Sequence, residues 1–148
     1  RWKVFMESGP KIKDLIAFHT SLKLTALAHS PKHYSALGRL VAQVKRYRPA
    51  VLYSEYIRKL MEGLRLIATV KKNTNVLLHV AGYFKKQMTP EDKRELLEVI
   101  EQYHKGHIPL IVPIVLINHC VRKFDEPYLK NQFYLNPHPL ELMLRNHV

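Results

Sequence analysis

Apolar residues recur at intervals of three and four along most of this 148-residue chain, and this helical spacing constrains the fold more than any other feature. No strict alternation of apolar and polar residues is long enough to indicate a sheet, and no Asn-Gly or Asp-Gly hairpin turn is present. Proline follows a hydroxyl residue at Ser30-Pro31 and Thr89-Pro90, as at many helix starts. The sequence therefore predicts an all-α fold, a single-domain bundle of about six to seven helices over residues 1–148.

The expected long helices can be placed from this spacing and from the prolines that interrupt it. They cover about residues 11–28, 31–48, 50–68, 71–86, 90–105 and 109–123. Asn73 or Thr74 is the expected N-cap of the fourth, and Gly106 is the expected residue just beyond the end of the fifth. The helix at about 109–123 is apolar nearly all round, so we expect it to be central. Prolines after Asp125 leave room for one short helix and an ordered tail.

The segment 71–86 has the pattern most typical of a binding surface. Two lysine pairs bracket it, and no acidic residue lies between Glu62 and Glu91. On a helix, one stripe of this segment is apolar, and a second stripe carries Lys72, Asn75, His79, Gly82 and Lys86 at spacings of 3, 4, 3 and 4. We therefore expect His79 on the polar side. The second stripe suits a phosphate backbone, and the alternative is a core helix with solvated lysines at its ends.

The charge balance points to polyanionic partners. The formal net charge is +12 and the pI is near 9.9, which makes nucleic acid the first expectation and an acidic membrane surface or acidic protein the alternative. Five of the twelve acids fall within residues 91–101, and the sequence alone does not decide whether they lie beside the lysines of the chain and neutralise them. Aromatic residues interleave with cations, which suits stacking on unpaired bases. The predicted nucleic-acid-binding residues are Lys71, Lys72, Asn75, His79, Tyr83, Lys85, Lys86, Lys45, Arg46 and Arg48.

Catalytic and metal-binding patterns are weak. None of the nine histidines has the regular spacing of a metal motif, so we interpret them as structural or surface residues and predict no metal ligand and no catalytic residue. Cys120 is the only cysteine, which excludes a disulfide within the chain, a cysteine-based zinc site and an iron–sulfur cluster. The longest apolar run is too short to cross a bilayer, so no membrane-spanning segment is expected, and of the partners that the charge allows we expect nucleic acid and not a membrane.

Several segments together resemble the YbgA-like domain over nearly the whole chain. They are Phe18-His19 with Lys23, Ala28-His29-Ser30, Thr74-Asn75-Val76-Leu77 with His79, Gly82-Tyr83-Phe84, Pro109-Leu110 with Pro113, Leu135 through Pro139, Glu141 and Leu144-Arg145-Asn146. In some bacteria this domain of unknown function occurs alone, and in others it follows a desulfidase domain that removes sulfur from 4-thiouridine in tRNA.

The resemblance implies that residues 1–148 are the C-terminal, tRNA-binding part of a longer cytoplasmic protein. It also implies that an N-terminal desulfidase domain of the same polypeptide carries a [4Fe-4S] cluster, while this domain holds no cofactor of its own.

Three positions depart from the family pattern. The family often has His where Leu22 and Asn73 stand, which weakens an enzymatic interpretation, and Tyr is common where Cys120 stands. The expected function is therefore recognition of tRNA for a 4-thiouridine desulfidase. The alternatives are a small nucleotide- or RNA-processing enzyme that uses a histidine and a carboxylate, or a scaffold that docks an acidic protein. A deep pocket with His79 or His29 beside a carboxylate would indicate the enzyme, and a broad basic face would indicate RNA binding.

Overall fold

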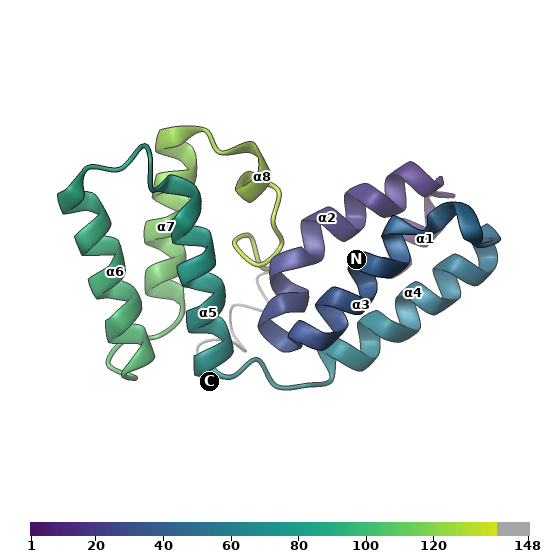
Figure 1. Ribbon diagram of the computed structural model, residues 1–148, viewed down its shortest axis with the longest axis horizontal. Helices are drawn as coiled ribbons and strands as arrows, with labels where there is room; N and C mark the ends of the chain where they lie inside the picture. The colour runs from purple at the N-terminus through teal and green to yellow at the C-terminus, as the bar shows by residue number, and fades with distance from the viewer. Residues whose placement is uncertain (139–148) are drawn as a thin grey trace. The chain divides into compact units, whose positions relative to one another are not determined.

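The computed structural model describes residues 1–138, and this part of the chain is helical without any strand (Figure 1). Its six long helices confirm the prediction of an all-α fold with about six to seven helices. The elements are α1 (Trp2–Glu7), α2 (Ile12–His29), α3 (Pro31–Ala42), the 3-10 turn η1 (Val44–Arg46), α4 (Pro49–Leu64), α5 (Val70–Ala81), the 3-10 turn η2 (Gly82–Phe84), α6 (Pro90–His104), α7 (Ile111–Phe124) and α8 (Pro127–Lys130). Contacts group them into two compact units, Arg1–Ile67 and Ala68–Val148, called here the first and second unit.

The first unit packs α2, α3 and α4 against one another, with α1 held by aromatic contacts. The Trp2 ring stacks on Tyr56 at 5.5 Å between centroids, and Phe5 stacks on Phe18 at 4.7 Å. A helix of six residues is not stable alone, so these contacts hold α1 in place. Helix α1 was not predicted from the sequence.

The second unit packs α5, α6 and α7 around the apolar stripe of α5. Val76, Leu77 and Val80 are completely buried there, together with Phe84 from η2. Within residues 1–138, no helix combines the length and the hydropathy that crossing a lipid bilayer requires.

Hydroxyl side chains cap the N-termini of α3, α5 and α6. Thr89 caps α6 by accepting a hydrogen bond from Asp92 N at 3.1 Å, as its sequence context predicts, and Gly106 has a φ of +77° beyond the end of that helix. The expected cap of α5 is wrong. Thr69 is the N-cap and accepts from Lys72 N at 3.3 Å, so the helix begins before Asn73.

Asn73 is instead a buried structural residue. Its Nδ2 donates to the carbonyl of Ala68 at 2.9 Å, and its Oδ1 accepts from the Tyr134 hydroxyl at 2.8 Å. The amide therefore ties the first turn of α5 to the segment after α8. Among the residues that carry the family resemblance, Pro139, Glu141 and Leu144-Arg145-Asn146 lie outside the described residues.

Candidate nucleic-acid interface

The polar stripe predicted for segment 71–86 lies at the surface of the second unit. Asn75, His79, Gly82 and Lys86 are exposed and Lys72 is half-buried, whereas the apolar stripe of the same helix is fully buried. The prediction that His79 lies on the polar side is confirmed. A Cβ added at Gly82 would meet no atom within 4 Å, so the backbone there is open to a ligand.

Three aromatic rings meet at this surface, and we call them the ring cluster: His79, Tyr83 and Tyr128. The His79 and Tyr83 rings lie edge to face at 5.8 Å, and the Tyr83 and Tyr128 rings stack at 5.3 Å with planes 18° apart. Tyr83 is 39% exposed, and exposed aromatic rings are surfaces on which other rings stack. Sequence reasoning did not place Tyr128 in the candidate site, because it belongs to α8, far from Tyr83 along the chain.

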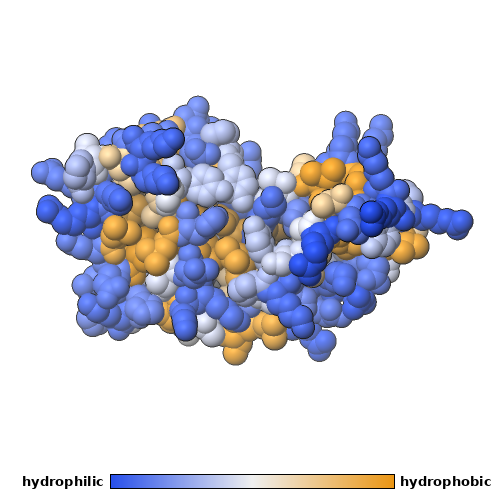
Figure 2. All heavy atoms as spheres, in the orientation of Figure 1, coloured by the Kyte–Doolittle hydropathy of each residue, from blue (hydrophilic) through white to orange (hydrophobic). Residues whose placement is uncertain are grey.

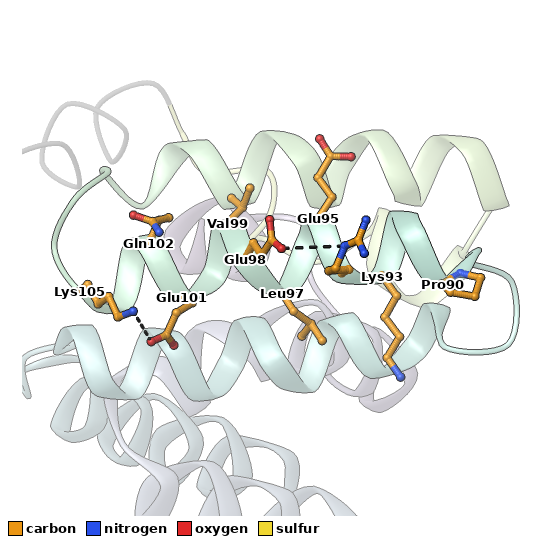
Figure 3. Close-up of a pocket in the computed structure, with 10 residues that line it drawn as sticks. Pro90, Lys93, Glu95, Leu97, Glu98, Val99, Glu101, Gln102 and Lys105 are labelled. Atoms are coloured by element: carbon orange, nitrogen blue, oxygen red, sulfur yellow. Dashed lines mark ion pairs between the residues drawn. The ribbon is translucent and has the colours of Figure 1, made fainter.

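The ion pairs that the acidic residues of α6 form within residues 1–138 do not involve Lys71, Lys85 or Lys86. Glu98 pairs with Arg94 at 4.0 Å and Glu101 with Lys105 at 3.2 Å, both within α6 (Figure 3), and Asp92 pairs with Lys123 of α7 at 3.3 Å. The two pairs within α6 line a shallow hollow of about 790 Å³ along that helix.

By contrast, Lys71, Lys85 and Lys86 are exposed and make no ion pair within residues 1–138. The positive charge of this segment is therefore available to an outside anion.

The other predicted basic residues belong to the first unit. Lys45 and Arg46 form part of η1, and Arg48 is the N-cap of α4. All three are exposed. They form a basic cluster of their own, separate in the chain from the lysines of the second unit.

Apolar side chains are also present on the surface of the second unit. Leu78 of α5 is 48% exposed and Leu97 of α6 is 38% exposed. Figure 2 shows apolar side chains gathered over these two helices, among hydrophilic ones. The face of the second unit is thus mixed, and only part of it is polar.

One hollow has both a histidine and carboxylates in its lining, although the histidine is neither His29 nor His79. A hollow of about 260 Å³ between α6 and α7 is lined by His119, Asp92 and Glu95. His29 instead bonds through Nδ1 to the carbonyl of Leu66 at 2.7 Å. No group of three or more His, Cys, Asp or Glu side chains suited to a metal ion occurs within residues 1–138.

The single thiol borders the same hollow. Cys120 is buried, and burial raises the pKa of its thiol, which the nearby carboxylate of Asp92 raises further. Although Lys123 lowers this pKa in part, burial and Asp92 outweigh it, so the thiol is protonated at neutral pH, unlike the thiolate of a reactive cysteine.

Ser30, His33 and Glu62 of the first unit are arranged like a catalytic triad, but their contacts serve helix capping and ion pairing. Ser30 Oγ lies 2.8 Å from His33 Nδ1, and His33 Nε2 lies 3.8 Å from a carboxylate oxygen of Glu62. Ser30 Oγ is also the N-cap of α3, accepting from His33 N at 3.3 Å, and the residue is only 4% exposed. Glu62 is bound by Arg58 at 2.6 Å. The Ser30 hydroxyl therefore acts as an N-cap, and this buried serine is not an accessible nucleophile.

Comparison with known proteins identifies similarity to proteins without an assigned activity. Residues 23–139 match the family model described as "Protein of unknown function (DUF1722)". The chain is 31% identical over 141 residues to "Uncharacterized protein YbgA" of Escherichia coli strain K12, covering 95% of this chain and 83% of that protein. No solved structure matches.

Proposed function

We propose, from the premise that this chain belongs to the YbgA-like family of proteins of unknown function (DUF1722), that it binds tRNA. The observation that carries the proposal is the combination of the exposed ring cluster with exposed lysines that have no acidic partner among residues 1–138. Rings take up unpaired bases and lysines take up phosphates, and RNA loops offer both.

Charge and sequence order support this assignment. Lys85 and Lys86 follow η2 directly, so they are close in sequence to Tyr83 of the ring cluster. A base stacked on Tyr83 would leave its phosphates within the positive field of this segment. Each phosphate contact adds about −0.9 to the slope of log affinity against log salt for a duplex, and about −0.7 for a single strand. Binding should therefore depend steeply on salt and only modestly on sequence.

The fuller form of the proposal is that the chain recognises substrate for a tRNA 4-thiouridine desulfidase in the cytoplasm. It draws on the resemblance to domains fused to such enzymes, in which the N-terminal domain carries the [4Fe-4S] cluster. The single cysteine of this chain supports a cluster in the other domain, because an iron–sulfur cluster needs three or four thiolates. Recognition and desulfurisation then belong to different domains of one polypeptide.

The test is tRNA binding by the double variant Lys85→Glu/Lys86→Glu. Binding of the parent and the variant to unmodified and thiolated tRNA is measured by filter retention from low to physiological salt. We expect the variant to bind at least tenfold more weakly to every tRNA and with a shallower salt slope. Far-UV circular dichroism should remain unchanged, because both lysines are exposed.

The matched control is Arg94→Glu/Lys105→Glu, which makes the same change in net charge on α6. Both residues form exposed ion pairs within that helix, and such pairs contribute well below 1 kcal/mol. This control should retain most of the tRNA affinity. Equal losses in the two double variants would show that only total charge matters, and unchanged binding by the first would refute the site.

The hollow that contains His119 supports a second candidate, an enzyme acting on a nucleotide or RNA. Asp92 and Glu95 line the same hollow, so a general acid and base are available there. Loss of a nucleotide- or RNA-processing activity in His119→Ala, with tRNA affinity unchanged, would support this candidate over binding alone.

A further inference from the structure

A hollow of about 390 Å³ lies between α2 and α3 of the first unit, and none of the residues that line it belongs to the candidate nucleic-acid site. This volume is at the lower end of the range for small-molecule sites. Polar side chains from both helices line it, namely His19, Thr20, Lys23, Tyr34 and Ser35, and no acidic residue does. The walls therefore present hydrogen-bond donors and a positive charge without a built-in counter-charge.

His19 is held with a fixed hydrogen-bond donor available to this hollow. The residue is 4% exposed, and its Nδ1 lies 3.2 Å from the hydroxyl of Tyr56. Tyr56 is completely buried, and its hydroxyl has no other hydrogen-bond partner within residues 1–138, so its proton must go to Nδ1. That fixes the imidazole proton on Nε2, which makes no hydrogen bond in the described part of the chain.

Lys23 supplies the charge. It is half-buried and has no ion-pair partner among residues 1–138. Asp14, the one acid between Ser8 and Ser54, accepts from the backbone N of Lys11 at 2.7 Å at the start of α2. The half-buried ammonium of Lys23 has lost part of its hydration without gaining a carboxylate partner. An anion bound in the hollow would supply the missing opposite charge.

Three further residues shape the hollow. The Tyr34 and Ser35 hydroxyls have no hydrogen-bond partner in residues 1–138, so both can donate to a ligand. Gly38 lies in the middle of α3, where a Cβ would meet no atom within 4 Å. A glycine in a helix interior costs about 0.5–1 kcal/mol relative to alanine. Its effect here is to keep the hollow open.

We propose that this hollow binds the phosphate group of a small ligand. Lys23 Nζ supplies the charge, and His19 Nε2 and the Tyr34 and Ser35 hydroxyls donate hydrogen bonds to the phosphate oxygens. Four donor groups from two helices match the many acceptor oxygens of a tetrahedral phosphate better than the two of a carboxylate. The inference does not depend on tRNA binding by the second unit.

The experiment is isothermal titration calorimetry of the full chain at pH 7 with three probes: inorganic phosphate, uridine 5′-monophosphate and acetate. We expect one site per chain, with acetate bound at least tenfold more weakly than phosphate. Equal affinity for phosphate and the nucleotide would identify the phosphate group as the recognised unit, and tighter nucleotide binding would identify a nucleotide site. Either result supports the proposal.

Two variants locate the site. Lys23→Met should weaken phosphate binding at least tenfold, and Gly38→Leu should abolish it by filling the hollow. Lys32→Met is the control, since Lys32 is an exposed lysine of α3 outside the hollow, and it should change affinity less than twofold. Trp2 fluorescence checks that the first unit is folded, and if Gly38→Leu is unfolded, Lys23→Met decides the matter.

Three outcomes would overturn the proposal. They are no binding of phosphate or nucleotide at millimolar concentration, acetate binding as tight as phosphate, and binding that Lys23→Met leaves unchanged.

Discussion

His19 should make the stability of the first unit depend on pH. Burial, with a smaller contribution from the positive charge of Lys23, lowers the pKa of this imidazole from 6.5 to about 4. In the unfolded chain the imidazole returns to its ordinary value. Below pH 6.5 the unfolded chain therefore binds a proton at His19, whereas the folded protein binds it only near pH 4. The free energy of unfolding falls between pH 6.5 and pH 4 and does not fall further on account of His19 below pH 4.

The magnitude follows from the size of the shift. One pKa unit corresponds to about 1.36 kcal/mol, so this histidine alone should lower the free energy of unfolding by about 3 kcal/mol between pH 7 and pH 4. That is a large fraction of the 5–15 kcal/mol that is typical of native domains. Nearly all of it should be lost below pH 6.5, where the unfolded imidazole is charged.

Urea unfolding at pH 7, 6, 5 and 4 measures the effect, with fluorescence of Trp2 as the signal. Trp2 is the single tryptophan of the chain and stacks on Tyr56, the partner of His19, so it reports on the first unit. The reference is His19→Gln, which keeps a hydrogen-bond acceptor for the Tyr56 hydroxyl but does not titrate. All other groups titrate alike in both proteins, so the difference between the two pH profiles belongs to His19. Parallel profiles between pH 7 and pH 4 would refute a neutral, desolvated His19.

Further predictions concern two helical glycines, a buried amide and the chemistry of the chain. Gly63→Ala should destabilise the protein by about 1–3 kcal/mol in urea unfolding, because the added Cβ would lie 2.8 Å from Cβ of His33. Gly38→Ala should stabilise the protein by about 0.5–1 kcal/mol, because the added Cβ would meet open space. Opposite signs in the two variants are the test. Asn73→Ala should cost about 1–3 kcal/mol by thermal and urea unfolding, because it removes the buried hydrogen bond between the Tyr134 hydroxyl and the Asn73 amide. The chain alone should not desulfurise thiolated tRNA after anaerobic incubation with iron and sulfide. Turnover in that assay would contradict the proposal that desulfurisation belongs to a different domain.

Much of the helical structure could be predicted because its signals are local. The start of α6 is encoded by Thr89, a proline and acids within one turn, and the structure places the cap there. The start of α5 was misplaced because Asn73 and Thr74 are good caps by type, and only tertiary packing decides that Asn73 is buried against Tyr134. Helix α1 was missed for the same reason, since the rings that hold it come from α2 and α4.

The candidate sites show the same limit. Periodicity placed His79 at the surface and Val76 in the core, because both follow from one helix. It could not place Tyr128 beside Tyr83, nor show that Tyr56 fixes the tautomer of His19, since each contact joins distant elements. Sequence patterns identified the faces of helices, and the partners across those faces required the structure.

The positive charge of the chain becomes informative only when its acids are located. A net charge of +12 could be spread evenly, and the acids of residues 91–101 could have paired with the lysines of segment 71–86. Their spacing favours pairing within α6 instead, since Arg94 and Glu98, and Glu101 and Lys105, stand four residues apart. Because the paired acids of α6 use cations of α6 and α7, Lys71, Lys85 and Lys86 have no acidic partner among residues 1–138 and can bind an outside anion. The salt dependence of tRNA binding should then reflect those few lysines and not the total charge, which is why the two double variants of equal charge are expected to differ.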